Sequence, residues 1–176
     1  MPLYAASSEY ALHSLVLLAG ADDDTHHSTR SIAEFQGLPA ALVAKLFTKL
    51  QRAGLVAASE GVRGGFVLAK SAETISVLDV VDAVEGQKAL FACRNIRKDC
   101  VLFDGNAPNW AKSGVCAIHS VMLEAEKKLR SELRQTSISD LSFQVASSAP
   151  DTFGSTTNAW LADAAASRRT RQSKPD

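Results

Sequence analysis

The stretch that decides the fold runs from Ser28 to Leu68 and reads STRSIAEFQGLPAALVAKLFTKLQRAGLVAASEGVRGGFVL. A short helical pattern ends near Gly37, and a longer one with apolar residues three and four positions apart covers about residues 40–52. An apolar strand, a glycine-rich turn at 61–65 and a second short strand follow. Two helices, a tight turn between them and a two-stranded hairpin are the order of a winged helix-turn-helix. The sequence therefore predicts a mainly α-helical fold with a small β-wing.

Local chemistry agrees with these boundaries. Ser28 or Thr29 can cap the first helix by accepting a backbone N–H bond. Gly37 can adopt the positive φ that ends this helix, and Pro39 suits the first turn of the next one, where a missing N–H costs nothing. Gly54 is placed to end the second helix.

The charge of this motif differs from that of the whole chain. The 176 residues have no net charge, but residues 28–70 contain six Lys and Arg against two Glu, a local balance of +4. A basic face on a winged helix is typical of phosphate binding, and the second helix of this motif enters the DNA major groove. The alternative is a solvated face on a winged helix that contacts proteins.

Composition limits the other function classes. The chain is 46% hydrophobic, which suits one globular domain with appendages or two small ones. No run is long enough to span a membrane, and the first residues have no basic region of a signal peptide, so we expect a cytoplasmic protein. The sequence contains no phosphate-binding loop, dinucleotide fingerprint or nucleophile motif, which argues against an enzyme.

The whole chain divides into four parts. Residues 1–86 form the predicted winged-helix domain, with a helix at about 7–20 and a last helix at 77–85 that starts at a capping-box pattern and ends at Gly86. Residues 87–117 lose regular periodicity and hold the cysteines. Residues 118–142 are predicted to form a dimerisation helix with a short last turn at 138–141. Residues 143–176, rich in Ser, Thr, Ala and Asp, are predicted to be a disordered tail, with a transient helix at 158–166.

The predicted dimerisation helix has one apolar stripe. Such a stripe on a helix outside a small domain must be buried on a partner, and a symmetry mate is the simplest partner. A homodimer would also present two reading helices to two half-sites of a palindromic operator. The alternative is a helix that folds back on its own domain. The stripe consists of Ile118, Met122, Ala125, Leu129 and Leu133.

The three cysteines allow two ligand sets. In one, Cys93, Cys100 and Cys116 join His119 of the same chain, a set that also suits structural zinc. In the other, two cysteines of one chain join Glu9 and His13 of a partner chain, because these two residues share one face of the first helix. Such mixed ligation would make an iron–sulfur cluster labile. Free thiols are the remaining alternative.

Several segments together resemble the Rrf2 family of bacterial transcriptional regulators, over about residues 1–142. They are SEYALHSLVLLA at 8–19, AGLV at 53–56, GGFVLA at 64–69 and LDVVDAVEG at 78–86. The resemblance implies a homodimeric winged-helix protein that binds palindromic double-stranded DNA. It also implies, for many members, sensing of iron–sulfur status, nitric oxide or redox state through a cluster in the loop before the dimerisation helix.

Within the family, the wide spacing before Cys116 departs from the three close cysteines of IscR-type and NsrR-type members. The chain is more similar to RsrR-type members. That likeness implies a 2Fe–2S cluster held by Glu9 and His13 of one subunit and by Cys93 and Cys116 of the other, with Cys100 as a spare ligand.

The recognition helix also departs from IscR-type members, in which a Glu-Gln pair reads bases. Ala44 and Lys45 occupy the matching positions, so a different operator is expected. The candidate groove-facing residues are Ala40, Ala41, Ala44, Lys45 and Thr48. The candidates for phosphate, minor-groove or wing contacts are Arg30, Lys49, Arg63 and Gly64.

The sequence thus predicts a transcriptional repressor or activator controlled by a 2Fe–2S cluster. Two alternatives stay open. One is a cluster-free regulator that uses thiol oxidation, zinc or a partner protein, and the other is an iron–sulfur redox protein or enzyme.

Overall fold

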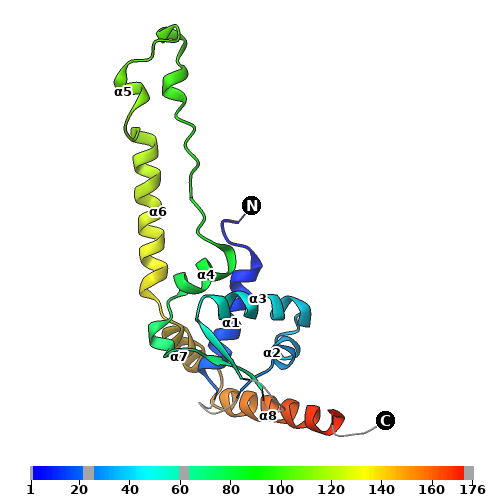
Figure 1. The fold of residues 1–176 in the computed structure, drawn as a ribbon. Coiled ribbons are helices and arrows are strands. Elements are labelled where there is room, and N and C mark those ends of the chain that lie inside the picture. The colour runs from blue at the N-terminus through cyan, green and yellow to red at the C-terminus, as the bar shows by residue number, and fades with distance from the viewer. Residues whose placement is uncertain (1, 22–25, 60–63, 173–176) are drawn as a thin grey trace. The chain divides into compact units, whose positions relative to one another are not determined.

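The computed structural model describes residues 2–21, 26–59 and 64–172. The chain divides into two compact units (Figure 1). Unit 1 comprises Met1–Gly86 and Leu133–Asp176, and unit 2 comprises Gln87–Glu132. Within the described residues, no helix has both the length and the apolar character that crossing a membrane requires.

Unit 1 is a helical domain with one small antiparallel sheet, which confirms the predicted mainly α-helical fold with a β-wing. Strand β1 (Val56–Ser59) pairs with β2 (Gly65–Leu68), with Val56 opposite Leu68 and Ser59 opposite Gly65. The helices are α1 (Ala6–Ala19), α2 (Thr29–Gln36), α3 (Ala40–Arg52), η1 (Ala72–Thr74), α4 (Val77–Glu85), α7 (Ile138–Ser148) and α8 (Thr152–Gln172).

The core of unit 1 forms where α3 meets α1, α4 and the sheet. The apolar face predicted for α3 is buried, with Val43, Phe47 and Leu50 fully inaccessible to solvent. Phe47 contacts Phe66 of β2 edge to face, with ring centroids 4.9 Å apart. This contact joins the β1–β2 hairpin to α3.

The caps of the helix-turn-helix follow the sequence closely. Ser28 Oγ accepts the N–H of Ser31 at the start of α2, and Gly37 ends this helix with a φ of 65°. Pro39 differs from the prediction, because it is the N-cap of α3 rather than part of its first turn. Its backbone is extended (φ −63°, ψ 127°), and its carbonyl accepts the first hydrogen bonds of α3 from Leu42 and Val43.

The wing approaches the segment before α2 very closely. His27 and Phe66 form an isolated antiparallel bridge, with backbone N···O distances of 3.1 and 2.8 Å. A Cβ at Gly65 would lie 2.7 to 2.9 Å from the backbone of His27, inside van der Waals contact. Glycine is therefore required at 65 by this close approach.

Helix α4 begins and ends where the sequence predicted. Asp79 N–H donates to Ser76 Oγ, and Ser76 N–H donates to the Asp79 carboxylate, which completes a capping box. Partial burial alone would raise the pKa of Asp79. The hydrogen bonds from Ser76, together with the charges of Lys70 and Arg134, outweigh it and lower this pKa below its usual 3.8.

The C-terminal part differs most from the prediction. The expected short turn at 138–141 is the start of α7, which has 11 residues, and α8 has 21 residues where a disordered tail at 143–176 was predicted. A second capping box between Ser137 and Asp140 starts α7, and Ile138 is fully buried. Leu161 of α8 is 1% exposed, and Trp160 contacts Phe35 of α2 edge to face at 5.4 Å. Burial against distant parts of the chain therefore stabilises α7 and α8. Residues 173–176 of the predicted tail lie outside the described residues.

Unit 2 is built from short elements and most of one long helix. The elements are η2 (Ile96–Asp99), η3 (Val101–Phe103), α5 (Asn109–Lys112) and α6 (Ala117–Gln135), whose last three residues belong to unit 1. In the single chain that the structure describes, α6 buries none of its side chains.

Candidate nucleic-acid interface and cysteine site

Helix α3 presents one exposed face opposite its buried one. Small side chains and Lys45 lie on this face, with exposed Lys49 and Arg52 in the last turn, and the hydroxyl of Thr48 donates to the carbonyl of Ala44 at 2.9 Å. Small side chains of this kind would let the helix backbone approach a groove closely, with Lys45 among them to supply positive charge. All five predicted groove-facing residues are exposed: Ala40, Ala41, Ala44, Lys45 and Thr48.

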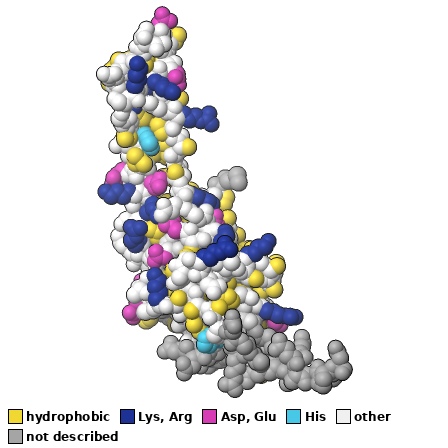
Figure 2. All heavy atoms as spheres, viewed as in Figure 1, with side chains coloured by type: hydrophobic (Ala, Val, Ile, Leu, Met, Phe, Trp, Pro, Cys, Tyr) yellow, Lys and Arg dark blue, Asp and Glu magenta, His cyan; other side chains and the backbone are white. Residues whose placement is uncertain are grey.

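The predicted phosphate-contacting residues lie in different settings. Arg30 is exposed in the first turn of α2, and Gly64 is half-buried before β2. Lys49 is exposed, but its ammonium donates to the carbonyl of Val84 in the last turn of α4, so its charge stabilises that helix end. Arg63 lies outside the described residues. Figure 2 shows Lys and Arg side chains on the face of unit 1 around α3.

In unit 2, the loop brings two of the three cysteines together. Cys116 directly precedes α6, and its Sγ accepts the N–H of His119 at 3.3 Å. Cys93 Sγ accepts the N–H of Asn95 at 3.4 Å. The Cys93 side chain is near enough to Cys116 to lower the pKa of the Cys116 thiol. Both cysteines are half-buried. Two cysteine side chains far apart in the sequence thus lie near each other.

Arg97 closes this loop, and sequence reasoning missed it. Its guanidinium donates to the carbonyls of Trp110 (3.1 Å) and Gly114 (3.0 Å), and its Nε donates to Asn95 Oδ1 (3.1 Å). These bonds tie the segment after Cys93 to the segment before Cys116. The sequence offers only a weak signal, because Arg94 and Arg97 both lie between Cys93 and Cys100 in a stretch without periodicity.

The surroundings of Cys116 favour its thiolate. The N–H of His119 that points at Sγ lowers the pKa of the Cys116 thiol below its usual 9.0, against a smaller opposing effect of desolvation. The charge of Arg97, the Cys93 thiol and the N–H of Ile118 lower this pKa further. Thiolate is the form that binds metals and reacts with oxidants.

The residues of the single-chain alternative are not gathered in the same way. Cys100 is exposed at the start of η3, and the ring of His119 packs against Phe91 with centroids 6.0 Å apart. Across the described residues, no three His, Cys, Asp or Glu side chains are placed to hold one metal ion. The Cys₃His set is therefore not assembled in this chain.

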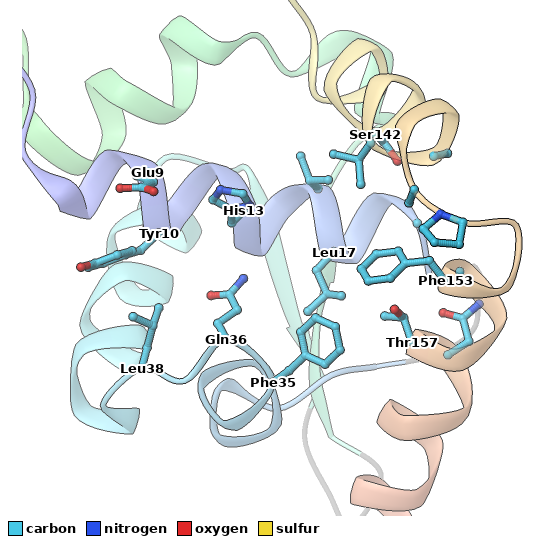
Figure 3. A pocket seen from close by; sticks show the side chains of 18 of the residues that line it. Glu9, Tyr10, His13, Leu17, Phe35, Gln36, Leu38, Ser142, Phe153 and Thr157 are labelled. Atoms are coloured by element: carbon cyan, nitrogen blue, oxygen red, sulfur yellow. The ribbon is translucent and has the colours of Figure 1, made fainter.

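Glu9 and His13 lie one turn apart on α1, and both are exposed. They line a cavity of about 630 Å³ between α1, α2, α7 and α8 (Figure 3). The opposite side of α1 is buried in the core through Ala11 and Leu15. The two halves of the predicted ligand set thus belong to different units of the chain.

The predicted dimerisation stripe is open to solvent in the single chain. Ile118 is 70% exposed and its neighbour Val121 is 67% exposed. Ala125 is exposed, and Met122, Leu129 and Leu133 are only partly covered.

Comparison with known proteins identifies the family. The profile of the Rrf2 family, described as an iron-dependent transcriptional regulator, matches residues 4–144. The chain belongs to the Rrf2 family. It is 30% identical to the rrf2 protein of Nitratidesulfovibrio vulgaris over 134 residues, 76% of this chain and 83% of that protein. It is also 30% identical to the transcriptional repressor NsrR of Streptomyces coelicolor over 135 residues, 76% of this chain and 84% of that protein.

Solved structures show the same fold. CymR of B. subtilis, described as a global cysteine regulator, has a TM-score of 0.64 at 21% identity and covers 82% of this chain and 98% of its own. IscR of T. potens has a TM-score of 0.64 at 21% identity and covers 85% of this chain and 92% of its own.

Membership in this family establishes the general function. The chain is a DNA-binding transcriptional regulator of the Rrf2 family rather than an enzyme, as the sequence predicted. The matched region ends at residue 144, so all of α8 lies beyond it.

Proposed function

We propose that this Rrf2-family regulator is a cytoplasmic homodimer whose affinity for a palindromic operator is set by a 2Fe–2S cluster. Cys93 and Cys116 of one subunit and Glu9 and His13 of the other would hold the cluster. The observation that carries this proposal is the pairing of Cys93 with Cys116, while Cys100 stays exposed. The signal would be redox state, nitric oxide or iron–sulfur supply.

The residues present fit such a group. Two thiols lie together, and one of them is held toward its thiolate form by the N–H of His119 and by Arg97. Glu9 and His13 can approach a cluster from a second chain because both are exposed on one face of α1. Both residues are needed, because the two cysteines supply only two of the four ligands that a cluster requires. When bound, the cluster would supply a redox-active centre whose charge depends on its state.

Helix α1 would connect the cluster to DNA reading. One face carries Glu9 and His13, and the other packs against α3 and α4 through the core. A change in what Glu9 and His13 bind therefore acts on the helix that supports α3. Because protein cores are close-packed, core side chains have little free space in which to take up a shift of α1. Such a shift would therefore move α3 as well.

The dimer would form through α6. Its apolar stripe is uncovered in the single chain, and a second copy would bury it. Two copies of α3 would then enter two major-groove half-sites. The exposed small side chains of α3 and Lys45 would face the bases, while Arg30 and the wing would contact the backbone.

Anaerobic purification of the full chain tests the cluster. We expect a coloured protein with about two irons and two acid-labile sulfides per chain and visible bands that change on reduction. Cys93→Ser, Cys116→Ser, Glu9→Ala and His13→Ala should each lower the iron content, whereas Cys100→Ser should retain it. A colourless protein after reconstitution would contradict the proposal, and stoichiometric zinc would favour the Cys₃His alternative.

A thiol switch is the second candidate, and the same Cys93–Cys116 contact favours it. A hydroperoxide would take two electrons and two protons from the two thiols, which would leave a disulfide together with two waters, or with one alcohol and one water when the peroxide is organic. In this case, metal-free protein treated with peroxide should lose two free thiols and change its operator affinity. Cys93→Ser should abolish both effects.

A further inference from the structure

We propose that the cavity of unit 1 is a binding site for a lipophilic organic cation. The cavity lies between α1, the α2–α3 turn, α7 and the start of α8 (Figure 3). Its volume of about 630 Å³ falls within the range of about 300 to 1,000 Å³ that is usual for small-molecule sites. The inference concerns unit 1 alone and does not depend on the proposed cluster.

The walls provide an apolar environment with aromatic rings. Tyr10 and Leu17 of α1, Phe35 of α2 and Phe153 of α8 line the cavity, and Figure 3 shows Leu17, Phe35 and Phe153 close together. Aromatic faces attract cations when the cation is desolvated, and apolar walls favour a ligand with a large hydrocarbon surface. The cavity thus suits a molecule that is both bulky and apolar.

The charged residues that line the cavity favour a cationic ligand over an anionic one. Glu9 lies at one end and Asp151 lies in the link between α7 and α8. Among the described residues that line the cavity, none is Lys or Arg. An organic anion would lose its hydration without gaining a cationic partner, whereas a cation would gain one or two carboxylates.

One polar side chain is positioned by a contact behind the wall. Gln36 lines the cavity, and its Oε1 lies 3.1 Å from the hydroxyl of buried Ser14, which also donates to the carbonyl of Tyr10 at 2.7 Å. His13 lies on the same face of α1 as Glu9. These groups give the site a polar end next to its apolar body, which is the usual composition of a ligand pocket.

The outer wall comes from the part of the chain beyond the family match. Asp151, Phe153 and Thr157 all follow residue 144, where that match ends. Trp160 of the same helix contacts Phe35, which is itself a cavity wall. A bound ligand would therefore change the surroundings of Trp160, one of two tryptophans in the chain.

The test compares two ions of nearly equal size and opposite charge. Tetraphenylphosphonium and tetraphenylborate are titrated into metal-free full-length protein that carries Trp110→Phe, so that Trp160 alone fluoresces. Calorimetry measures the affinities in parallel. We expect saturable binding of the cation with a change in Trp160 emission, and an affinity at least about tenfold above that of the anion.

Matched variants locate the binding. Thr157→Phe fills the cavity, while Ala159→Phe places the same ring on the exposed side of α8. Cation affinity should fall at least about tenfold in the first and stay unchanged in the second. Asp151 lies in the exposed link between α7 and α8. Asp151→Asn should lower the affinity for the cation severalfold, while the circular dichroism spectrum stays that of the parent.

Three outcomes would overturn the inference: no saturable binding of the cation, equal or tighter binding of the anion at a site that Thr157→Phe removes, or cation binding that Thr157→Phe leaves intact. Because the protein is metal-free throughout, these outcomes are separate from the iron and sulfide measurements that test the proposed cluster.

Discussion

At the scale of single residues, Arg97 and Cys116 show how the loop builds its chemistry. Cysteine spacing alone identified Cys93, Cys100 and Cys116 as candidates, but it did not show which two would meet. The answer depends on backbone carbonyls of residues 110–114, which accept the Arg97 guanidinium. Every residue carries a backbone carbonyl that can accept such a bond, so no sequence pattern predicts these contacts.

The first prediction concerns the reactivity of Cys116 in metal-free, reduced protein. Its lowered thiol pKa leaves more thiolate at neutral pH than an unperturbed cysteine has, so it should react with iodoacetamide faster at pH 7. Arg97→Gln should slow this reaction by up to about tenfold, because it removes a nearby positive charge and loosens the loop. Peptide mass spectrometry gives the rate at each cysteine.

Lys98→Gln, an exposed neighbour, is the control for this experiment and should leave the rate unchanged. Equal slowing in both variants would mean that Arg97 acts only through the overall charge of the loop.

The second prediction concerns Gly65. Gly65→Ala would force its Cβ against the His27 backbone, so we expect a loss of about 1 to 3 kcal/mol in the free energy of unfolding. Gly154→Ala is the contrast, because no atom lies within 4 Å of that Cβ and Gly154 is inside a helix. It should be neutral or stabilise by up to about 1 kcal/mol. Urea unfolding of both variants measures the difference; a neutral Gly65→Ala would refute the close approach.

At the scale of elements, the sequence predicts well wherever the signal is local. The bounds of α4 follow from Ser76, Asp79 and Gly86, and the start of α2 follows from Ser28, all within one helical turn of the boundary. For α8 the sequence predicted only a transient helix at 158–166, because its Ser, Thr and Ala residues form no apolar stripe. Trp160 and Leu161 hold it against residues far away in the sequence, which pattern reading does not detect.

The third prediction concerns the capping box of α4. The folded-state pKa of Asp79 is depressed below 3.8, so its stabilising effect is present above that value and is lost as the pH falls through the folded-state pKa. Asp79→Asn should therefore be less stable than the parent at pH 7, by about 1 kcal/mol or less because the carboxylate is largely exposed. This difference should shrink below pH 3.8.

Thermal unfolding as a function of pH measures this effect. Asp163→Asn, on the exposed face of α8, is the control and should give a parallel curve. If Asp79→Asn lowers the stability equally at every pH, the capping box acts through its hydrogen-bond geometry rather than through the charge of Asp79.

At the scale of the whole molecule, the proposal requires two copies of the chain. The fourth prediction concerns the α6 stripe: Ile118→Glu places a charge in the proposed interface and should raise the dimer dissociation constant at least about tenfold. Lys127→Glu, an exposed charge reversal off the stripe, should leave association intact. Sedimentation equilibrium distinguishes the two. A monomeric parent, or an Ile118→Glu variant that dimerises normally, would place the interface elsewhere.

Each proposed cluster is shared between two subunits, and mixing two variant subunits can test this sharing. One variant carries Glu9→Ala and His13→Ala, and the other carries Cys93→Ser and Cys116→Ser. Neither homodimer contains a complete ligand set, whereas the mixed dimer contains one. The two proteins are co-expressed with different tags, the mixed dimer is isolated anaerobically, and its iron, sulfide and visible spectrum are measured. We expect colourless homodimers and a coloured heterodimer with about two irons. A colourless heterodimer, or a coloured homodimer of either variant, would contradict it.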